Sequence, residues 1–153
     1  IKSTYADADQ VNLNIGDKIE FTNTPAKRFY LSNEWSNVED GAVWGYGKES
    51  SISFSIKKIP ECIPLLEFSI EPIQSNDISK LELFVNDKLI QSFRPFPNIH
   101  TYKFDLDDNI FNRNNYLKFI NNFSATPQSL DMGNDNRILS IRFLKGIWKK
   151  NEN

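Results

Sequence analysis

The chain has 153 residues and a formal net charge of −2, with 25% charged and 39% hydrophobic residues. This length suits one domain with a single core, and the near-neutral charge excludes the basic excess that nucleic-acid or anionic-membrane binding favours. The single cysteine, Cys62, excludes an internal disulfide or a cysteine-based zinc cluster, and the single histidine, His100, excludes sites that need two. We therefore expect residues 1–153 to form one domain with a polar tail at about 149–153, no nucleic-acid partner and no membrane insertion.

Short runs of alternating apolar and polar residues recur along the chain, and an aromatic content of 12 Phe, 5 Tyr and 3 Trp also favours strands over helices. Strands are predicted at 18–22, 28–31, 42–46, 51–56, 66–71, 81–85, 89–93, 101–106, 116–120 and 137–144, the last continuing towards Trp148. Asn86-Asp87-Lys88 predicts a tight hairpin turn, and 110–114 indicates one short helical turn. This spacing is typical of an all-β, jelly-roll-like β-sandwich of about nine antiparallel strands.

Most catalytic arrangements are excluded by residue counts and spacing. The sequence has no Gly-x-Ser-x-Gly elbow to present a serine nucleophile, and no glycine spacing that fits a dinucleotide or phosphate loop. Cys62 lies between Pro60 and Pro64 in an apolar stretch, which indicates a small buried residue rather than an activated thiolate. We predict that the chain is not an enzyme. A hydrolase or esterase is a weaker hypothesis than the two non-catalytic roles given below.

Two segments depart from plain alternation. Residues 32–47 hold two Trp, a Tyr, three acids and three Gly, and aromatic rings beside carboxylates are groups that bind the apolar faces and hydroxyls of sugars. Burial in the core is the stronger interpretation for Trp44, whereas Trp35 is balanced between core and ligand platform. In residues 129–137, Asp135 and Arg137 form either a structural ion pair, the safer interpretation, or hydrogen bonds to a ligand.

Both segments carry a resemblance to a known group of domains. The matching positions are Trp35-Ser36-x-x-Glu39, Gly41-x-x-Trp44 and Gly47 in the first segment, and Asp135-x-Arg137-x-Leu139-Ser140-Ile141 in the second. Together they resemble motifs of β-sandwich accessory domains appended to bacterial glycosyltransferases and phosphoglycerol transferases of surface-polysaccharide synthesis. The resemblance implies a non-catalytic domain that contacts glycan and is joined to a transferase region in a longer chain of the bacterial cell-envelope glycan pathway. Because the sequence begins at Ile1 rather than Met, we also expect it to be an excised or processed piece.

The leading hypothesis is a carbohydrate-binding domain for capsule, O-antigen or teichoic-type glycan. Its ligand residues would be Trp35, Glu39, Trp44, Asp135 and Arg137, brought together by loops at one end. The alternative is a structural or docking domain that orients a transferase or mediates oligomerisation without binding sugar. No cofactor is expected. Oxygen ligands for a structural calcium ion exist at 107–109 and 131–135, but neither run has the spacing of a defined calcium loop.

Overall fold

The computed structural model describes residues 16–20, 35–36, 39, 41–56, 64–74, 80–107 and 109–150. These residues form nine strands and one 3-10 helix. The strands are β1 (Lys18–Glu20), β2 (Val43–Tyr46), β3 (Glu49–Ser55), β4 (Pro64–Pro72), β5 (Leu81–Val85), β6 (Lys88–Phe93), β7 (His100–Asp105), β8 (Asn114–Asn121) and β9 (Leu139–Lys150), and the helix η2 is Gln128–Leu130. The predicted all-β class is confirmed.

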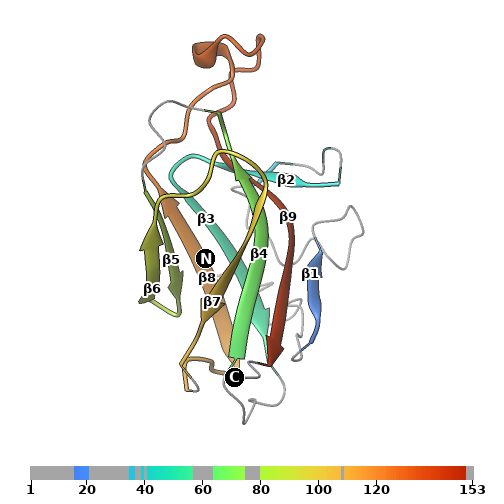
Figure 1. The fold of residues 1–153 in the computed structure, drawn as a ribbon, viewed down its shortest axis with the longest axis vertical. Helices are drawn as coiled ribbons and strands as arrows, with labels where there is room; N and C mark the ends of the chain where they lie inside the picture. Colours follow the sequence, from blue (N-terminus) through green and yellow to red (C-terminus); the bar gives the residue numbers. More distant parts are fainter. Residues whose placement is uncertain are drawn as a thin grey trace, which may run out of the picture.

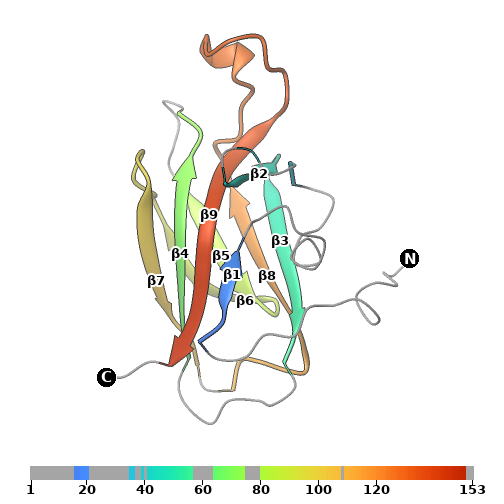
Figure 2. The same ribbon diagram turned by 90° about the vertical axis from the view of Figure 1, so that its right-hand side faces the viewer.

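The strands are arranged in two sheets that pack face to face (Figures 1 and 2). The five-stranded sheet has the order β1-β9-β4-β7, with β2 pairing β9 as well, and the four-stranded sheet has the order β3-β8-β5-β6. Every pairing between the described strands is antiparallel. The β-sandwich expected from the sequence is therefore the observed architecture.

The core lies between the two sheets and is built by the predicted alternation. In β3, Ile52 and Phe54 are buried while the alternating serines Ser51, Ser53 and Ser55 are only half-buried. The facing sheet contributes Phe68 from β4 and Phe143 from β9, which are fully buried and meet at 6.1 Å between ring centroids, edge to face. Phe119 of β8 reaches across to both of these rings, with centroid distances of 5.3 Å to Phe68 and 5.0 Å to Phe143. Edge-to-face aromatic contacts thus join the two layers.

The hairpin between β5 and β6 turns at Asn86 and Asp87, which have positive φ angles of 49° and 69°. Val85 pairs with Lys88, so the turn has two central residues, and the predicted hairpin is confirmed. The Asn86 amide donates to the carbonyl of Ile110 at 2.9 Å and accepts from the Tyr116 N–H at 3.0 Å. Asparagine is favoured here because it tolerates the left-handed conformation and anchors the turn to β8.

The helical turn predicted at 110–114 is wrong. Residues 110–113 are irregular, and β8 begins at Asn114. The Asn115 amide accepts from the Asn112 N–H and donates to the Asn112 carbonyl, both at 2.7 Å. Side-chain bonds therefore satisfy backbone groups that a helical turn would have paired. The predicted strand at 28–31 and Cys62 lie outside the described residues.

One end of the sandwich, at the top of Figure 1, gathers the β2–β3 turn, the β6–β7 loop and the long β8–β9 connection. Hydrogen bonds join the β2–β3 turn to β8 and the β8–β9 connection: the Gly47 N–H donates to the Ile138 carbonyl at 2.9 Å, and the Asn121 side-chain amide donates to the Gly47 carbonyl at 3.0 Å. We call this region the loop end. Among the described residues, no helix is long and apolar enough to cross a membrane.

Candidate functional site

The first motif segment folds back on itself beside β2. Trp35 pairs with Gly45 as an isolated bridge, and Glu39 pairs with Ala42 through two backbone bonds of 2.7 and 3.1 Å. Gly41, between Glu39 and Ala42, has a φ of +77°, a conformation that glycine adopts without strain. The motif positions Glu39 and Gly41 therefore form a tight turn that leads into β2.

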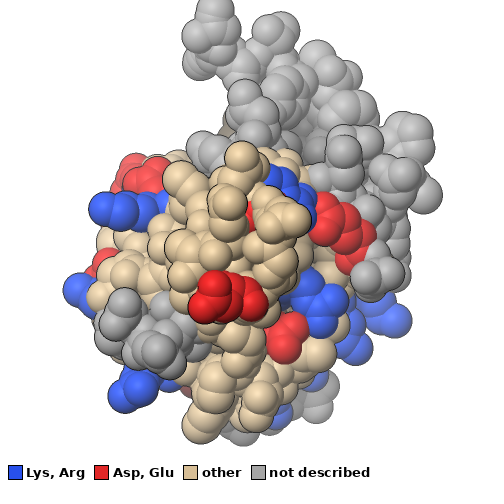
Figure 3. Space-filling model, turned by 90° about the horizontal axis from the view of Figure 1, so that it is seen from above, with Lys and Arg blue, Asp and Glu red and all other residues tan. Residues whose placement is uncertain are grey.

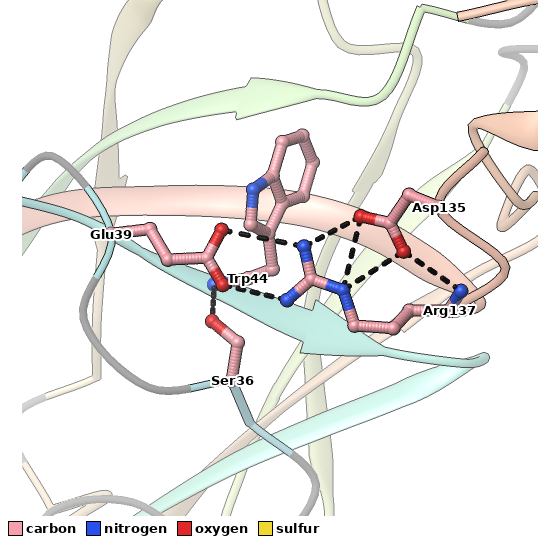
Figure 4. A network of polar contacts seen from close by, with 5 residues as sticks. All are labelled: Ser36, Glu39, Trp44, Asp135 and Arg137. Carbon is pink, nitrogen blue, oxygen red and sulfur yellow. Dashed lines mark hydrogen bonds and ion pairs between the residues drawn. The ribbon is translucent and has the colours of Figure 1, made fainter. Parts of the chain in front are cut away.

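Ser36 locks this turn to β2. Its N–H donates to the Trp44 carbonyl and its Oγ accepts from the Trp44 N–H, both at 2.9 Å (Figure 4). Ser36 is buried, so the two bonds lie away from water, where lost partners would be costly. The serine of the Trp-Ser motif thus has a structural role that sequence reasoning did not assign to it.

Trp35 is a core side chain, and the expectation that it offers an open stacking face is wrong. Only 7% of its surface is exposed, and its ring meets Phe143 edge to face at 4.7 Å. Its indole Nε1–H donates to the Ser51 carbonyl at 2.9 Å, on β3 at the edge of the other sheet. Trp35 is buried because it spans the gap between β2 and β3 and satisfies a carbonyl there.

The three polar residues predicted for the site, Glu39, Asp135 and Arg137, converge at the loop end (Figure 4). Arg137 donates from Nη1 to Glu39 Oε2 at 2.6 Å and from Nη2 to Glu39 Oε1 at 3.3 Å. On its other side it donates from Nη2 to Asp135 Oδ2 at 2.7 Å, and from Nε to Oδ1 and Oδ2 at 3.0 and 3.1 Å. The guanidinium thus joins a turn near the start of the chain to the connection before β9. We call Glu39, Asp135 and Arg137 the carboxylate clamp.

The clamp is accessible to solvent as well as tightly bonded. The side chains of Glu39, Arg137 and Asp135 are 40%, 34% and 32% exposed. Hydrogen bonds from the Arg137 side chain and backbone hold the pKa of Asp135 at about 2, below its ordinary 3.8. Hydrogen bonds to Asp135 first, then to Glu39, raise the pKa of Arg137 further above its already high value, and the Tyr46 side chain also bonds to it. Asp135 is therefore ionised at neutral pH, which suits an acceptor of hydrogen bonds and not a general acid for glycoside cleavage.

Trp44 lies on β2, on the strand face opposite the buried Val43. It is half-buried, packs against the edge of the core and pairs across the ladder with Arg142 of β9. Tyr46, two residues further along the same strand, is also half-buried and bonds to Arg137. Sequence reasoning missed Tyr46, although period-two alternation from Trp44 would have placed it on the same face.

Figure 3 views the molecule from the loop end, where acidic and basic side chains are scattered among other residues and acidic side chains lie near the middle of the face. No group of three or more His, Cys, Asp or Glu side chains that could hold a metal ion occurs among the residues the structure describes. Asp131 and Asp135 are among these described residues, whereas Asp108 lies outside them.

Comparison with known proteins identifies the fold. No protein-family model and no curated protein sequence matches the chain. Among solved structures, a CBM36 carbohydrate-binding module in complex with calcium and xylotriose is similar with a TM-score of 0.50 and 10% identity, over 87% of this chain and 99% of that one. A cellobiose complex of CsCBM6-3 from Clostridium stercorarium has a TM-score of 0.47 and 6% identity over 93% and 98% of the two chains. The mannan-recognising module TmCBM27 has a TM-score of 0.49 and 11% identity over 90% and 98%. At 10% identity the likeness to the CBM36 module shows a similar β-sandwich fold alone.

Proposed function

We propose that this chain is a non-catalytic carbohydrate-binding domain that takes a neutral saccharide at its loop end. The observation that carries the proposal is the carboxylate clamp: Arg137 bonds to Glu39 and Asp135 while all three side chains stay partly exposed. The half-buried Trp44 lies on β2, into which the Glu39 turn leads. The fold shared with carbohydrate-binding modules supports it, since loops at one end of such a sandwich are a suitable place for a ligand site.

The chemistry of the clamp favours a neutral ligand. Two carboxylates and one guanidinium leave a net charge of −1, which would repel phosphate or carboxylate groups of a glycan. Each carboxylate oxygen has more than one acceptor site, so the clamp keeps acceptors for sugar hydroxyls after Arg137 is bonded. Holding those acceptors in place before binding lowers the entropy cost of recognition.

The biological setting is the finer part of the proposal. The motifs around Trp35–Glu39 and Asp135–Ile141 resemble those of accessory domains in bacterial surface-polysaccharide enzymes. On that basis we place the domain beside a glycosyltransferase region of a longer chain, where it would hold the growing glycan. A neutral capsule or O-antigen repeat suits the clamp better than a phosphate-rich teichoic polymer.

A structural or docking role is the second candidate, and two observations favour it. Trp35 is buried, and the clamp joins segments 98 residues apart in the sequence, which is what a structural staple would do. Under this reading, replacing Glu39 or Arg137 lowers stability and no saccharide binds. The two functions therefore differ in a direct binding measurement.

The test is isothermal titration calorimetry with xylotriose, cellohexaose, mannohexaose and oligosaccharides of neutral bacterial capsules. We expect binding that persists in EDTA and in 0.5 M NaCl, and a loss of about tenfold or more in Glu39→Gln. Asp107→Asn is the matched control, because it removes one partner of the exposed Lys88–Asp107 ion pair, outside the clamp. Absence of binding to every saccharide, or equal loss in both variants, would refute the proposal.

A further inference from the structure

A second group of aromatic side chains lies at the β6–β7 loop and takes no part in the clamp. Phe96 is 57% exposed, His100 is exposed and Tyr102 is half-buried. The Phe96 ring lies 4.7 Å from that of His100 and stacks on Tyr102 at 6.4 Å with an interplanar angle of 17°. We call Phe96, His100 and Tyr102 the aromatic shelf. Because more than half of Phe96 faces solvent, the shelf has an open ring surface.

The shelf is fixed in place from beneath. Tyr102 contacts Phe93 at 5.0 Å, and Phe93 contacts the buried Phe104 at 5.7 Å, so a row of rings connects the shelf to the core. The Tyr102 hydroxyl accepts from the Phe96 N–H at 2.8 Å, which ties the loop to β7.

Proline and glutamine restrict the loop further. Phe96 stands between Pro95, which is buried, and Pro97, whose carbonyl accepts from the Gln74 amide at 2.7 Å. Each proline fixes its own φ and restricts the residue before it. A large apolar ring is thus held in water by a loop with little freedom to turn it inward, which is the geometry of a preorganised binding group.

We propose that the aromatic shelf is a second saccharide subsite, on which the apolar face of a pyranose ring stacks against Phe96 with His100 at its side. This inference rests on the proposed function and adds a site to it. A flat ring surface with a polar surround suits a sugar, because stacking covers the C–H face and leaves the hydroxyls in water or bonded to the rim.

Composition and size favour a saccharide over a second copy of the chain. Residues 94–102 contain no Asp or Glu, and Arg94 and Asn98 on this loop are exposed polar groups that can bond hydroxyls. Phe96 and Ile99, which is 50% exposed, are the large apolar side chains that this loop exposes. Two such side chains offer a few hundred Å² at most, whereas a stable protein interface needs about 800 Å² from each partner.

The shelf and the clamp lie at the same end of the five-stranded sheet, so one glycan could reach both. Val43 of β2 pairs with Phe143, Phe143 with Ile70, and Ile70 with His100, which makes one continuous row across the sheet. Three strand spacings separate the ends of this row, about 15 Å. A single sugar ring is too short for that span, so the geometry predicts that oligosaccharides of several rings bind better than disaccharides.

The test compares substitutions at Phe96 in titrations with cellohexaose, xylotriose and mannohexaose. Phe96→Leu keeps an apolar side chain but removes the ring, whereas Phe96→Trp keeps a ring. We expect Phe96→Leu and Phe96→Ala to lose about tenfold in affinity and Phe96→Trp to retain it. Leu89→Ala is the matched control, since Leu89 is 46% exposed on β6 away from the loop. Unchanged thermal melting of the variants would separate binding from folding.

Each outcome decides between the two proposals. Full affinity in Phe96→Leu or Phe96→Ala, together with weakened binding in Glu39→Gln, would overturn the shelf and leave the proposed function standing. Self-association in light scattering that disappears in Phe96→Ala would overturn it in favour of a second copy. Failure of the unmodified chain to bind any of the saccharides would overturn both proposals.

Discussion

Replacing Trp35 by alanine should destabilise the fold rather than merely abolish ligand binding. The side chain is 93% buried, against Phe143 and the edge of β3. A buried tryptophan removes about 150–250 Å² from water, worth about 4–6 kcal/mol at about 25 cal/mol per Å². That figure is an upper bound because the unfolded chain is partly compact, and truncations of Phe or Trp in other cores cost about 3–5 kcal/mol.

The assay is urea unfolding followed by circular dichroism, with Trp35→Phe and Trp44→Ala alongside. Trp35→Ala should lose about 3–5 kcal/mol, which lowers the melting temperature by about 6–20 °C for a domain of this size. Trp35→Phe fills most of the space but leaves the Ser51 carbonyl without its indole donor, so about 1–2 kcal/mol should be lost. Trp44→Ala, at a half-buried position, should cost less than Trp35→Ala. A Trp35→Ala chain that is as stable as the parent yet binds no saccharide would refute this account and restore Trp35 as a ligand platform.

Three further predictions concern the clamp and the sheet. Arg137→Ala should lower the free energy of unfolding in urea by about 1–2 kcal/mol, since it removes two ion pairs whose side chains are about one-third exposed. An unchanged free energy of unfolding would contradict a stabilising role of the clamp. The folded-state pKa of Asp135 is lowered to about 2, so its contribution to stability is present above pH 4 and is lost as the pH falls from 4 to 2. The urea midpoint of the parent should therefore fall over this pH range, and that of Asp135→Asn should depend less on pH. Gly146→Ala should cost about 1–3 kcal/mol, because a Cβ there would lie 2.6 Å from the buried Phe68 ring, and unchanged melting would show that β4 and β9 pack differently.

The sandwich could be predicted from sequence because its strands follow a local rule. The alternation at 51–56 puts Ile52 and Phe54 inward in β3, and Asn86-Asp87 turns β5 into β6, as predicted. Both features depend on neighbouring residues alone. The helical turn predicted at 110–114 was wrong because the Asn115 side chain bonds to backbone groups that a helix would have paired. A short window of sequence does not reveal such side-chain bonds.

The candidate site depends on contacts between distant residues. Asp135 and Arg137 are two residues apart, and their pairing was among the alternatives that the sequence left open. Glu39 lies 98 residues from Arg137, so only the motif resemblance suggested that they meet. The burial of Trp35 could not be predicted from neighbouring residues, because it depends on contact with β3, the edge strand of the opposite sheet.

The aromatic shelf had a weaker signal that sequence reasoning passed over. Phe96 stands between two prolines in a loop, which exposes a large ring on a stiff backbone. Its stacking on Tyr102 and its contact with His100 follow from the position of β7 at the sheet edge, which the order of strands in the chain does not give.

The most direct test of saccharide recognition at the clamp uses the side-chain N–H signals of a ¹⁵N-labelled chain. Three tryptophans give three indole signals, and Arg137 Nε–H reports on the clamp itself. On titration with cellohexaose, xylotriose, mannohexaose and a neutral capsule oligosaccharide, we predict that the signals of Trp44 and Arg137 shift with at least one of them. The signals of the buried Trp35 and Trp148 should stay in place. Saturating saccharide that moves neither the Trp44 nor the Arg137 signal would contradict a binding site at the loop end.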